Sequence, residues 1–419
     1  MSGALSHIKV LDLSRVLAGP LAGQILADLG AEVIKVERLD KGDDTRAWGP
    51  PYLSDDNGVA TSESAYFATA NRNKKSVAID LAHPDGQALI RSLAAECDVI
   101  IENFKVDGLH QYGLDYASLS EINPRLVYCS ITGFGQDGPY AARAGYDFLM
   151  QGLGGLMSIT GHGGDQPGAG PMKVGVALTD VMTGLYAVIG VLAALSARAL
   201  SGSGQHIDLA LLDVQVAGLA NQAMNYLSTG NVPQRMGNSH PSIVPYQDFA
   251  TADGFMIIAV GNDGQFERLC KALDHPEWAR DERYATNVAR VAHRSELVSL
   301  LHAATVKQPT SYWIDTLEKA GVPCGPINDV RQVFEDPQVR ARGMRVNMAH
   351  PLAGNVAMVA NPIRLSDTPV EYRLPPPLLG QHTGEVLQSI LGLSQDRLNE
   401  LIAEGAIQCP QYANRVPPA

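Results

Sequence analysis

Cysteine is scarce in this sequence, and the cysteines are widely separated. The 419 residues include five, with no CxxC pair among them. The five are Cys97, Cys129, Cys270, Cys324 and Cys409. Structural zinc sites and disulfide frameworks both need closely and regularly spaced cysteines, so this distribution predicts neither of them. We therefore expect reduced thiols, as is usual in the cytoplasm, and no bound metal.

Positive charge is also scarce relative to negative charge. The chain has 32 Lys and Arg residues against 44 Asp and Glu residues, which gives a formal net charge of −12 at pH 7. This balance argues against general binding to nucleic acid or to a membrane surface. An anionic ligand would need a local group of basic residues.

Long apolar runs are missing as well. The longest, residues 184–200, is interrupted by Ser196 and Arg198, which favours a buried helix over a membrane span. Residues 1–10 contain no basic segment followed by an apolar run, so we expect no signal peptide and a cytoplasmic location. The motifs HExxH and G-x-S-x-G, the P-loop and the EF-hand loop are also absent from the sequence.

What is present is a repeated pattern of short apolar runs and helical segments. Residues 8–13 form an apolar run, residues 21–29 have apolar side chains at helical spacing, and residues 31–36 form a second β-rich run. Two strands joined by a helix predict a parallel crossover unit. Because the pattern recurs at residues 84–101 and 126–131, we expect an α/β fold with a Rossmann-like, doubly wound sheet.

The composition changes near residue 230, where a segment rich in Pro, Ser, Asn and His begins. We expect residues 1–225 to form the first part of a large Rossmann-like domain, and residues 226–330 to form a smaller α+β domain with its linkers. Residues 331–419 are expected to return to the large domain.

The loops after the predicted strands are the expected walls of a ligand site, because ligands of such sheets bind beyond the carboxyl ends of the strands. These loops are residues 14–20, 37–48, 102–108 and 132–147.

The first crossover unit could suggest a dinucleotide site. It has Gly19, Gly23 and Gly30, and an acid, Glu37, at the end of the second strand. The spacing differs from G-x-G-x-x-G, and Pro20 removes a backbone N–H where a pyrophosphate would bind. We interpret the glycines as packing residues, which leaves an NAD-linked oxidoreductase as a disfavoured alternative.

Asp180 stands just before a long apolar helix that is expected to begin at about Val181. A carboxylate there commonly caps the helix by accepting its free N–H groups. The same position favours the ionised form, and an ionised, partly desolvated carboxylate is a competent nucleophile toward a thioester. The local sequence leaves both interpretations open, with the cap as the commoner case.

Basic residues concentrate in the predicted loops. They are Arg15, Arg38, Arg46, Arg72, Lys74, Lys75 and Arg143. Such side chains could bind phosphates or carboxylates, which Arg contacts bidentately, or could only solvate a surface. Trp48, close to Arg46, could line a pocket or only pack, and a histidine such as His240 beside Pro241 is more often a satisfied polar residue than a catalyst.

A series of short motifs extends over nearly the whole chain. They are VLD at 10–12 with AGP at 18–20, LGAEVIKVE at 29–37, GD at 42–43 with Arg46 and Trp48, NKKS at 73–76, ENF at 102–104, GFG at 133–135, TD at 179–180 with TG at 183–184, GSGQ at 202–205 and LLGQHT at 378–383. In order and spacing they resemble the class III CoA-transferase family, which includes the formyl-CoA:oxalate and carnitine CoA-transferases. Within it, residues 43–52, 143–147, 242–247 and 373–383 are most similar to the succinyl-CoA:glutarate (hydroxymethylglutarate) CoA-transferases.

The resemblance implies a catalytic role for Asp180 and an interlocked homodimer. In this family an acyl-CoA acylates the aspartate, giving a mixed anhydride, and the released thiolate then forms an aspartyl-CoA thioester. The substrates would be an acyl-CoA, such as succinyl-CoA, and a small carboxylic acid. A separate cofactor is not expected, since the CoA thioester is itself a substrate.

The resemblance also implies two groups of binding residues. The family's CoA contacts map onto Val16, Ala18, Arg38, Ile79, Asn103, Phe104, Arg143 and Tyr146. The candidates for binding the acid are Arg15, Arg46, Trp48, Arg72 and His240. If the acid is a dicarboxylate, its second carboxylate needs a cation, and the sequence does not choose among Arg15, Arg46 and Arg72.

Some positions depart from the formyl-CoA transferases, which have Gln in place of Leu17 and an arginine in place of Gln111. Their long glycine-rich lid is also not matched by residues 261–265, which makes oxalate and formate poor candidates.

Acyl-CoA racemases share the fold and use the His of a Gly-His-Asp stretch as a base. Here that stretch contains Tyr146, whose side chain, with an ordinary pKa of about 10, is a poor base at neutral pH, so a transferase is favoured over a racemase. A non-catalytic CoA-binding protein is a further alternative.

Overall fold

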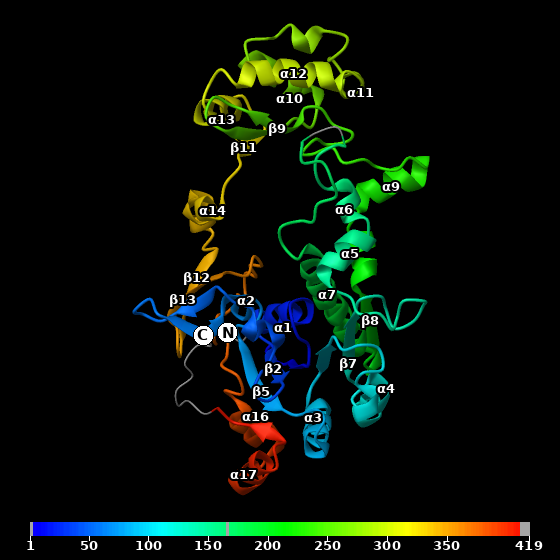
Figure 1. Cartoon of the computed structure of the whole chain (residues 1–419), viewed down its shortest axis with the longest axis vertical. Coiled ribbons are helices and arrows are strands. Elements are labelled where there is room, and N and C mark those ends of the chain that lie inside the picture. The colour runs from blue at the N-terminus through cyan, green and yellow to red at the C-terminus, as the bar shows by residue number, and fades with distance from the viewer. Residues whose placement is uncertain (1–2, 165–166, 411–419) are drawn as a thin grey trace. The chain divides into compact units, whose positions relative to one another are not determined.

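The computed structural model describes residues 3–164 and 167–410 (Figure 1). The chain forms two compact units, each with its own core. The first consists of Met1–Leu156, Val174–Leu227 and Arg340–Ala419, and the second of Met157–Lys173 and Ser228–Val339. The sequence predicts divisions after residues 225 and 330, whereas the contacts divide the chain after residues 227 and 339 and also assign residues 157–173 to the second unit.

A seven-stranded sheet forms the centre of the first unit. Its strand order is β14-β5-β2-β1-β6-β7-β8, and all neighbouring strands are parallel except β14 and β5. The strands are β1 (Lys9–Asp12), β2 (Glu32–Glu37), β5 (Lys74–Ile79), β6 (Val99–Glu102), β7 (Val127–Thr132), β8 (His206–Ala210) and β14 (Ile407–Gln408). The order runs outward from β1 in both directions, so its switch point lies between β1 and β6. This topology confirms the predicted α/β class with a predominantly parallel sheet.

Helices cover both faces of this sheet, because successive side chains of each strand point to opposite faces. In β1, Val10 belongs to one core and Leu11 to the other. The face of Val10 is covered by α1 (Ala18–Asp28) and α7 (Leu178–Ser201). The face of Leu11 is covered by α3 (Pro84–Glu96), α4 (Tyr116–Ile122), α16 (Thr383–Leu391) and α17 (Gln395–Ala403). Strands buried on both sides read as apolar runs, which is why the sequence predicts them.

The helix α7 has 24 residues and ends at Gly202, whose φ of +79° is a conformation that glycine adopts without strain. Its length and its mean hydropathy of 1.8 would also suit a membrane span, but one side packs on α1 and on β7 and β8. The side that its own unit leaves uncovered carries Leu185, Ile189 and Leu192.

Smaller elements of the first unit lie in the connections. They are the 3-10 helices η1 (Asp44–Ala47) and η2 (His110–Tyr112), the paired strands β3 (Tyr52–Ser54) and β4 (Ala60–Ser64), and the helices α2 (Ala65–Thr69), α5 (Asp147–Leu153) and α8 (Leu211–Ala217). Strands β12 (Arg345–His350) and β13 (Gly354–Val359) form an antiparallel hairpin. Three helices cross the boundaries between the units, namely α6 (Leu156–Ile159), α9 (Ala220–Thr229) and α15 (Pro337–Ala341).

The second unit contains a three-stranded antiparallel sheet of order β11-β10-β9. Its strands are β9 (Tyr246–Ala250), β10 (Phe255–Ala259) and β11 (Cys324–Pro326). Its helices are α10 (Asp263–Ala272), η3 (Trp278–Arg280), α11 (Asn287–Ala292), α12 (Arg294–Thr305), α13 (Thr310–Lys319) and α14 (Val330–Glu335). The buried guanidinium of Arg290 joins parts of this unit by donating to the carbonyls of Val244 and Tyr284.

Candidate active site

The candidate site lies beyond the carboxyl ends of β1 and β6, at the switch point of the first unit's sheet. The Asn103 side chain joins the loops that follow these two strands. Its Oδ1 accepts from the backbone N–H of Arg15 at 2.8 Å, and its Nδ2 donates to the Arg15 carbonyl at 2.7 Å. These two bonds fix the spacing of the loops, as expected for the floor of a preformed site.

Val16 shows that the first of these loops is held under strain. Its φ is +73°, which a β-branched residue rarely adopts. Asp43 restrains it by accepting from the Val16 N–H at 3.2 Å, and Asp43 is itself paired with the buried Lys35 ammonium at 2.9 Å. Burial acts to raise the pKa of Asp43, but Lys35 outweighs it and lowers that pKa. Strained backbone that is fixed by buried ion pairs is typical of ligand sites.

A cavity of about 610 Å³ opens at this point, and we call it the Asp180 cavity. Its wall contains Asp180 together with six of the eight residues predicted to contact CoA, which are Val16, Ala18, Asn103, Phe104, Arg143 and Tyr146. The two departures from the formyl-CoA transferases, Leu17 and Gln111, also line it. The structure therefore brings most of the predicted binding residues to the predicted nucleophile, while their contact with CoA stays a prediction.

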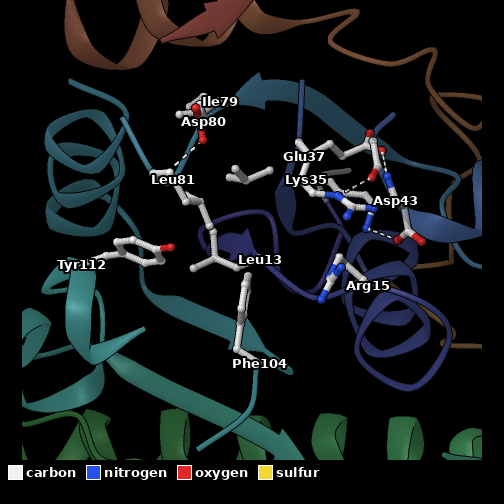
Figure 2. A pocket seen from close by; sticks show the side chains of 14 residues that line it. Leu13, Arg15, Lys35, Glu37, Asp43, Ile79, Asp80, Leu81, Phe104 and Tyr112 are labelled. Atoms are coloured by element: carbon white, nitrogen blue, oxygen red, sulfur yellow. Dashed lines mark hydrogen bonds and ion pairs between the residues drawn. The ribbon is translucent and has the colours of Figure 1, made fainter. Parts of the chain in front are cut away.

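The other two predicted CoA contacts, Arg38 and Ile79, line an adjoining cavity of about 210 Å³ (Figure 2). Phe104 and Tyr112 line both cavities, so the two spaces share a wall. Figure 2 shows the side chains of Leu13, Leu81, Phe104 and Tyr112 around the apolar part of this adjoining cavity. An apolar slot between aromatic rings, with Arg38 in its wall, has the chemistry to hold a flat ring that carries phosphates.

Asp180 does not cap its helix, contrary to the commoner interpretation of the sequence. α7 begins at Leu178, three residues earlier than expected, and places Asp180 in its first turn. Asp147, the first residue of α5, serves as the cap. Its Oδ1 accepts from the backbone N–H of Thr179 at 2.8 Å and of Asp180 at 3.3 Å. Among residues 3–164 and 167–410, no donor bonds to the Asp180 carboxylate itself, which lies in the cavity wall.

The pKa of Asp180 is raised to about 7, first by burial and second by the negative charge of Asp147. The sequence favours the ionised form because of the helix N-terminus, but Asp147 has taken the N–H groups of that turn. The carboxyl group of Asp180 is therefore only partly ionised at neutral pH. Tyr66, from α2, lies near enough that the charges of Asp180 and Asp147 add to the effect of burial in raising its own pKa.

Arg15 is the one candidate cation for the acid that the structure places in the wall of the Asp180 cavity. Its guanidinium pairs with Asp44 at 3.0 Å and lies 5.5 Å from the centre of the Phe104 ring, with 34% of the side chain exposed. Arg38 pairs with the same Asp44 carboxylate at 2.5 Å. Two arginines that share one carboxylate leave an excess positive charge for an incoming anion.

Arg46 and Arg72, the other two candidates, direct their guanidinium groups into the protein. Arg46 donates to both oxygens of Glu37 at 2.7 Å and lies over the Phe67 ring. Arg72 donates to both oxygens of Asp28, at 3.0 and 2.6 Å. Arg72 and Asp28 are buried, and only 10% of the Arg46 side chain is exposed. Neither arginine lines either cavity, although Glu37 lines the adjoining one, so both arginines fix the fold around the site.

Trp48 and His240 also lie outside the walls of both cavities. Trp48 is 43% exposed and packs edge-on against Tyr66 at 5.1 Å, which places it behind a ring that is close to Asp180. His240 belongs to the second unit, where its Nδ1 accepts from the Ser242 N–H at 3.1 Å and its ring contacts Tyr246. Their proposed contact with the acid stays a prediction.

Three residues of the site are missed by reasoning from the sequence. Asp147 follows Tyr146 directly, but no local signal marks it as the acceptor for the first turn of α7. Tyr66 has no local signal. Lys105 lines the Asp180 cavity next to the ENF motif and forms no ion pair with any residue in the described part of the chain. In that same part, no three His, Cys, Asp or Glu side chains are grouped as a metal site would require.

Comparison with known proteins adds information of a different kind. Residues 5–383 match the sequence model of CoA-transferase family III. A succinate–glutarate CoA-transferase of Agrobacterium fabrum is 54% identical over 386 residues, which cover 92% of this chain and 95% of that protein. The human succinyl-CoA:glutarate CoA-transferase is 45% identical over 404 residues, which cover 96% and 90%. The crystal structure of a CAIB/BAIF family protein from Brucella suis has a TM-score of 0.81 and 50% identity, and covers 93% of this chain and all of that one.

Proposed function

Because the chain belongs to CoA-transferase family III, we propose that it transfers CoA from succinyl-CoA to a small dicarboxylic acid such as glutarate, with Asp180 as the covalent carrier. The choice of acids rests on the names of its relatives. The observation that carries the mechanism is the Asp180 carboxylate, which no described residue bonds and which faces a cavity large enough for the arm of an acyl-CoA.

The reaction proceeds by exchange of acyl groups on Asp180. A carboxylate oxygen attacks the thioester carbonyl, the C–S bond breaks, and a mixed anhydride and the CoA thiolate result. The thiolate then attacks the aspartyl carbonyl, releasing the donor acid as its carboxylate and leaving CoA on Asp180 as a thioester. The acceptor carboxylate attacks that thioester, and the same two steps in reverse yield the new acyl-CoA and free Asp180. No net proton is consumed.

The binding of CoA is proposed to span both cavities. The adenine fits the adjoining cavity between apolar side chains and Phe104, with its phosphates near Arg38 and Arg15. Lys105 and Arg143 supply further positive charge in the wall of the Asp180 cavity, and Arg143 is held between the rings of Phe134 and Tyr140. This orientation directs the thioester end toward Asp180. Arg15 remains the best placed cation for the distal carboxylate of the acid.

We also propose that the active protein is a homodimer. The first unit leaves large apolar side chains exposed on neighbouring helices, namely Phe148, Leu149 and Leu153 of α5 and Leu185, Ile189 and Leu192 of α7. An apolar surface of this kind usually belongs to an interface. The interlocked form of the dimer follows from family resemblance.

The racemase alternative lacks support at the site. Racemization needs two bases on opposite sides of the α-carbon, whereas no histidine lines either cavity. Tyr146, where the racemases have their histidine, is 65% exposed.

The test is a screen of acceptor acids with succinyl-CoA, in which new thioesters are identified by mass. We expect glutarate or a similar dicarboxylate to yield its CoA thioester, and hydroxylamine to trap a modified Asp180. Asp180→Ala and Asp180→Asn are expected to lower the rate by at least about a thousandfold, as for other lost nucleophiles. Full activity of both variants, or CoA binding without any new thioester, would overturn the proposal.

A further inference from the structure

The first turn of α7 holds two carboxylates with different partners. We propose that Asp147 is a positioning residue, which accepts the free N–H groups of this turn in place of Asp180 and thereby leaves the Asp180 carboxylate to the substrate. The inference rests on the proposed role of Asp180 as the nucleophile.

The N-terminus of α7 needs an acceptor that its own sequence does not supply. The residue before the helix is Ala177, which has no polar side chain. An aspartate within the first turn is well placed to bond such N–H groups, so Asp180 would otherwise be the nearest acceptor. Asp147 Oδ1 instead takes the N–H groups of Thr179 and Asp180. With both N–H groups occupied, the Asp180 side chain has no competing partner in its own helix.

Asp147 is itself held in place on both carboxylate oxygens. Its Oδ2 accepts from Gln151 Nε2 at 2.7 Å, one helical turn further along α5. The Gln151 side chain is fully buried, and its Oε1 accepts from the Val174 N–H at 2.9 Å. Asp147 therefore cannot turn toward the substrate, which distinguishes it from a second nucleophile or a base.

The charge of Asp147 also changes the chemistry of its neighbour. Two nearby carboxylates resist being ionised together, so Asp147 makes Asp180 more basic. A more basic carboxylate is a stronger nucleophile once it is ionised. The groups that face Asp180 from packed elements are Asp147 and Tyr66, and the charged side chains in the cavity wall are Arg15, Asp44, Lys105 and Arg143. Asp147 is the neighbouring charge whose effect on Asp180 is resolved.

The test compares three variants of the full-length protein. Asp147→Asn keeps an oxygen for the α7 N–H groups but removes the charge. Asp147→Ala removes both. Asp213→Asn is the matched control, because Asp213 is an exposed acid in the first turn of α8 that does not contribute to the pKa of Asp180. For each variant we would measure the rate of hydroxylamine-trappable adduct formation with succinyl-CoA from pH 5 to pH 9, the KM for succinyl-CoA, and the Tm.

We expect Asp147→Asn to move the acid limb of the adduct rate to lower pH by about 0.5–1 unit. Asp147→Ala should lower the adduct rate at high pH by about ten- to a hundredfold, because the nucleophile turns away, while the KM stays within about twofold. If both variants keep the wild-type acid limb and rate and only the Tm falls, Asp147 is a structural cap and the inference is wrong. If the wild-type protein forms no adduct at Asp180, the proposed function itself fails, and the inference fails with it.

In Asp147→Asn the new amide nitrogen would face the Nε2 of Gln151, which is also a donor. The Tm shows whether this repulsion destabilises the fold, which would change the adduct rate for another reason. If that variant does not fold, the split between rate and KM in Asp147→Ala decides the matter. A proportional loss of rate and affinity there would count against the inference.

Discussion

The carboxyl group of Asp180, which we propose as the nucleophile, is kept partly protonated by its surroundings. Desolvation and the charge of Asp147 raise its pKa to about 7. Bound CoA would add phosphates near Arg15 and Lys105, but the reacting carboxylate itself has no donor to stabilise its charge among the described residues. In the proposed mechanism, the lack of a donor destabilises the Asp180 carboxylate and makes it more reactive toward the thioester.

The ionisation of Asp180 predicts an acid limb in the pH dependence of the reaction. Attack on the thioester needs the ionised form, so kcat/KM for succinyl-CoA should fall about tenfold per pH unit below an apparent pKa near 7. Initial rates between pH 5 and pH 9 would measure it. A profile that stays flat down to pH 5 would contradict the raised pKa.

The same pKa predicts the effect of Asp180→Asn on stability. A carboxyl group whose pKa is higher in the folded than in the unfolded chain stabilises the fold when protonated and loses that contribution as the pH rises through the folded pKa. For Asp180 the window runs from its ordinary value of 3.8 to about 7. Asp180→Asn should therefore raise the Tm most at pH 8, and by less than half as much at pH 5, which lies inside this window. Thermal unfolding at the two pH values is the measurement, with Asp213→Asn as the control, and an equal effect at both would speak against the prediction.

Two of the three arginines that the sequence could not distinguish, Arg15 and Arg72, should respond differently to substitution. Arg15→Met removes a cation from the cavity wall and should raise the KM for succinyl-CoA about tenfold with little change in Tm. Arg72→Met leaves the buried Asp28 carboxylate without its ion pair, and should lower the free energy of unfolding by about 3–5 kcal/mol. Steady-state kinetics and urea unfolding of both variants separate the two roles. The reverse pattern would place Arg72 at the substrate.

Among the elements, the contact between α1 and α7 sets the width of the site, because Ala18 and Asp180 lie on opposite helices and both line the cavity. Gly184 allows the close approach, since a Cβ there would come within 2.8 Å of the Ala18 carbonyl oxygen. Gly184→Ala should therefore push the helices apart, lowering both the Tm and kcat/KM.

The control for this helix contact is Gly190→Ala, six residues further along α7. A Cβ there would meet the γ2 methyl of the Ile207 side chain at 3.3 Å rather than a backbone atom, so a slight shift of that side chain and the higher helix propensity of alanine should leave stability nearly unchanged. Thermal unfolding and kcat/KM of both variants test the contact. Equal effects at the two positions would show that the α1–α7 distance does not matter.

The predictability of these elements differs for physical reasons. The buried parallel strands are predicted from the sequence because consecutive residues such as Val10 and Leu11 are both apolar and face opposite sides of the sheet. The position of the site follows from the topology, since the loops after β1 and β6 meet at the switch point. The start of α7 could not be predicted, because its cap is supplied by Asp147, 33 residues from Asp180, rather than by Ala177.

The pairing of buried charges could also not be predicted from the sequence. Arg72 reaches Asp28 across 44 residues of chain, and nothing local marks the acid as its partner. A basic residue in a loop therefore looks the same whether it binds a substrate or completes the fold. Only the tertiary structure separates Arg15 from Arg46 and Arg72 as a candidate for binding the acid.

For the whole molecule, the exposed apolar side chains predict a mass in solution near twice 44.7 kDa. Ile189 is 60% exposed in the middle of α7, so Ile189→Lys should weaken the dimer or prevent its assembly. Val288→Lys, at an 81% exposed position of the second unit, is the control and should leave the mass unchanged. Light scattering after size-exclusion chromatography measures both. A wild-type mass of 44.7 kDa at every concentration would refute the dimer.

One edge of the main sheet is completed by β14, the last strand in the described part of the chain. Ile407 in β14 pairs with Ile79 in β5, and the backbone N–H of His382 donates to the Ser76 carbonyl. A ribosome adds about 5–20 residues per second, so the nascent β5 waits roughly 15–65 s for its partner to be made. During that time it presents an open edge that other strands can join. In chains truncated before β14, this edge of β5 would stay unpaired. In the cell, such fragments would be prone to aggregate and would be substrates for quality control.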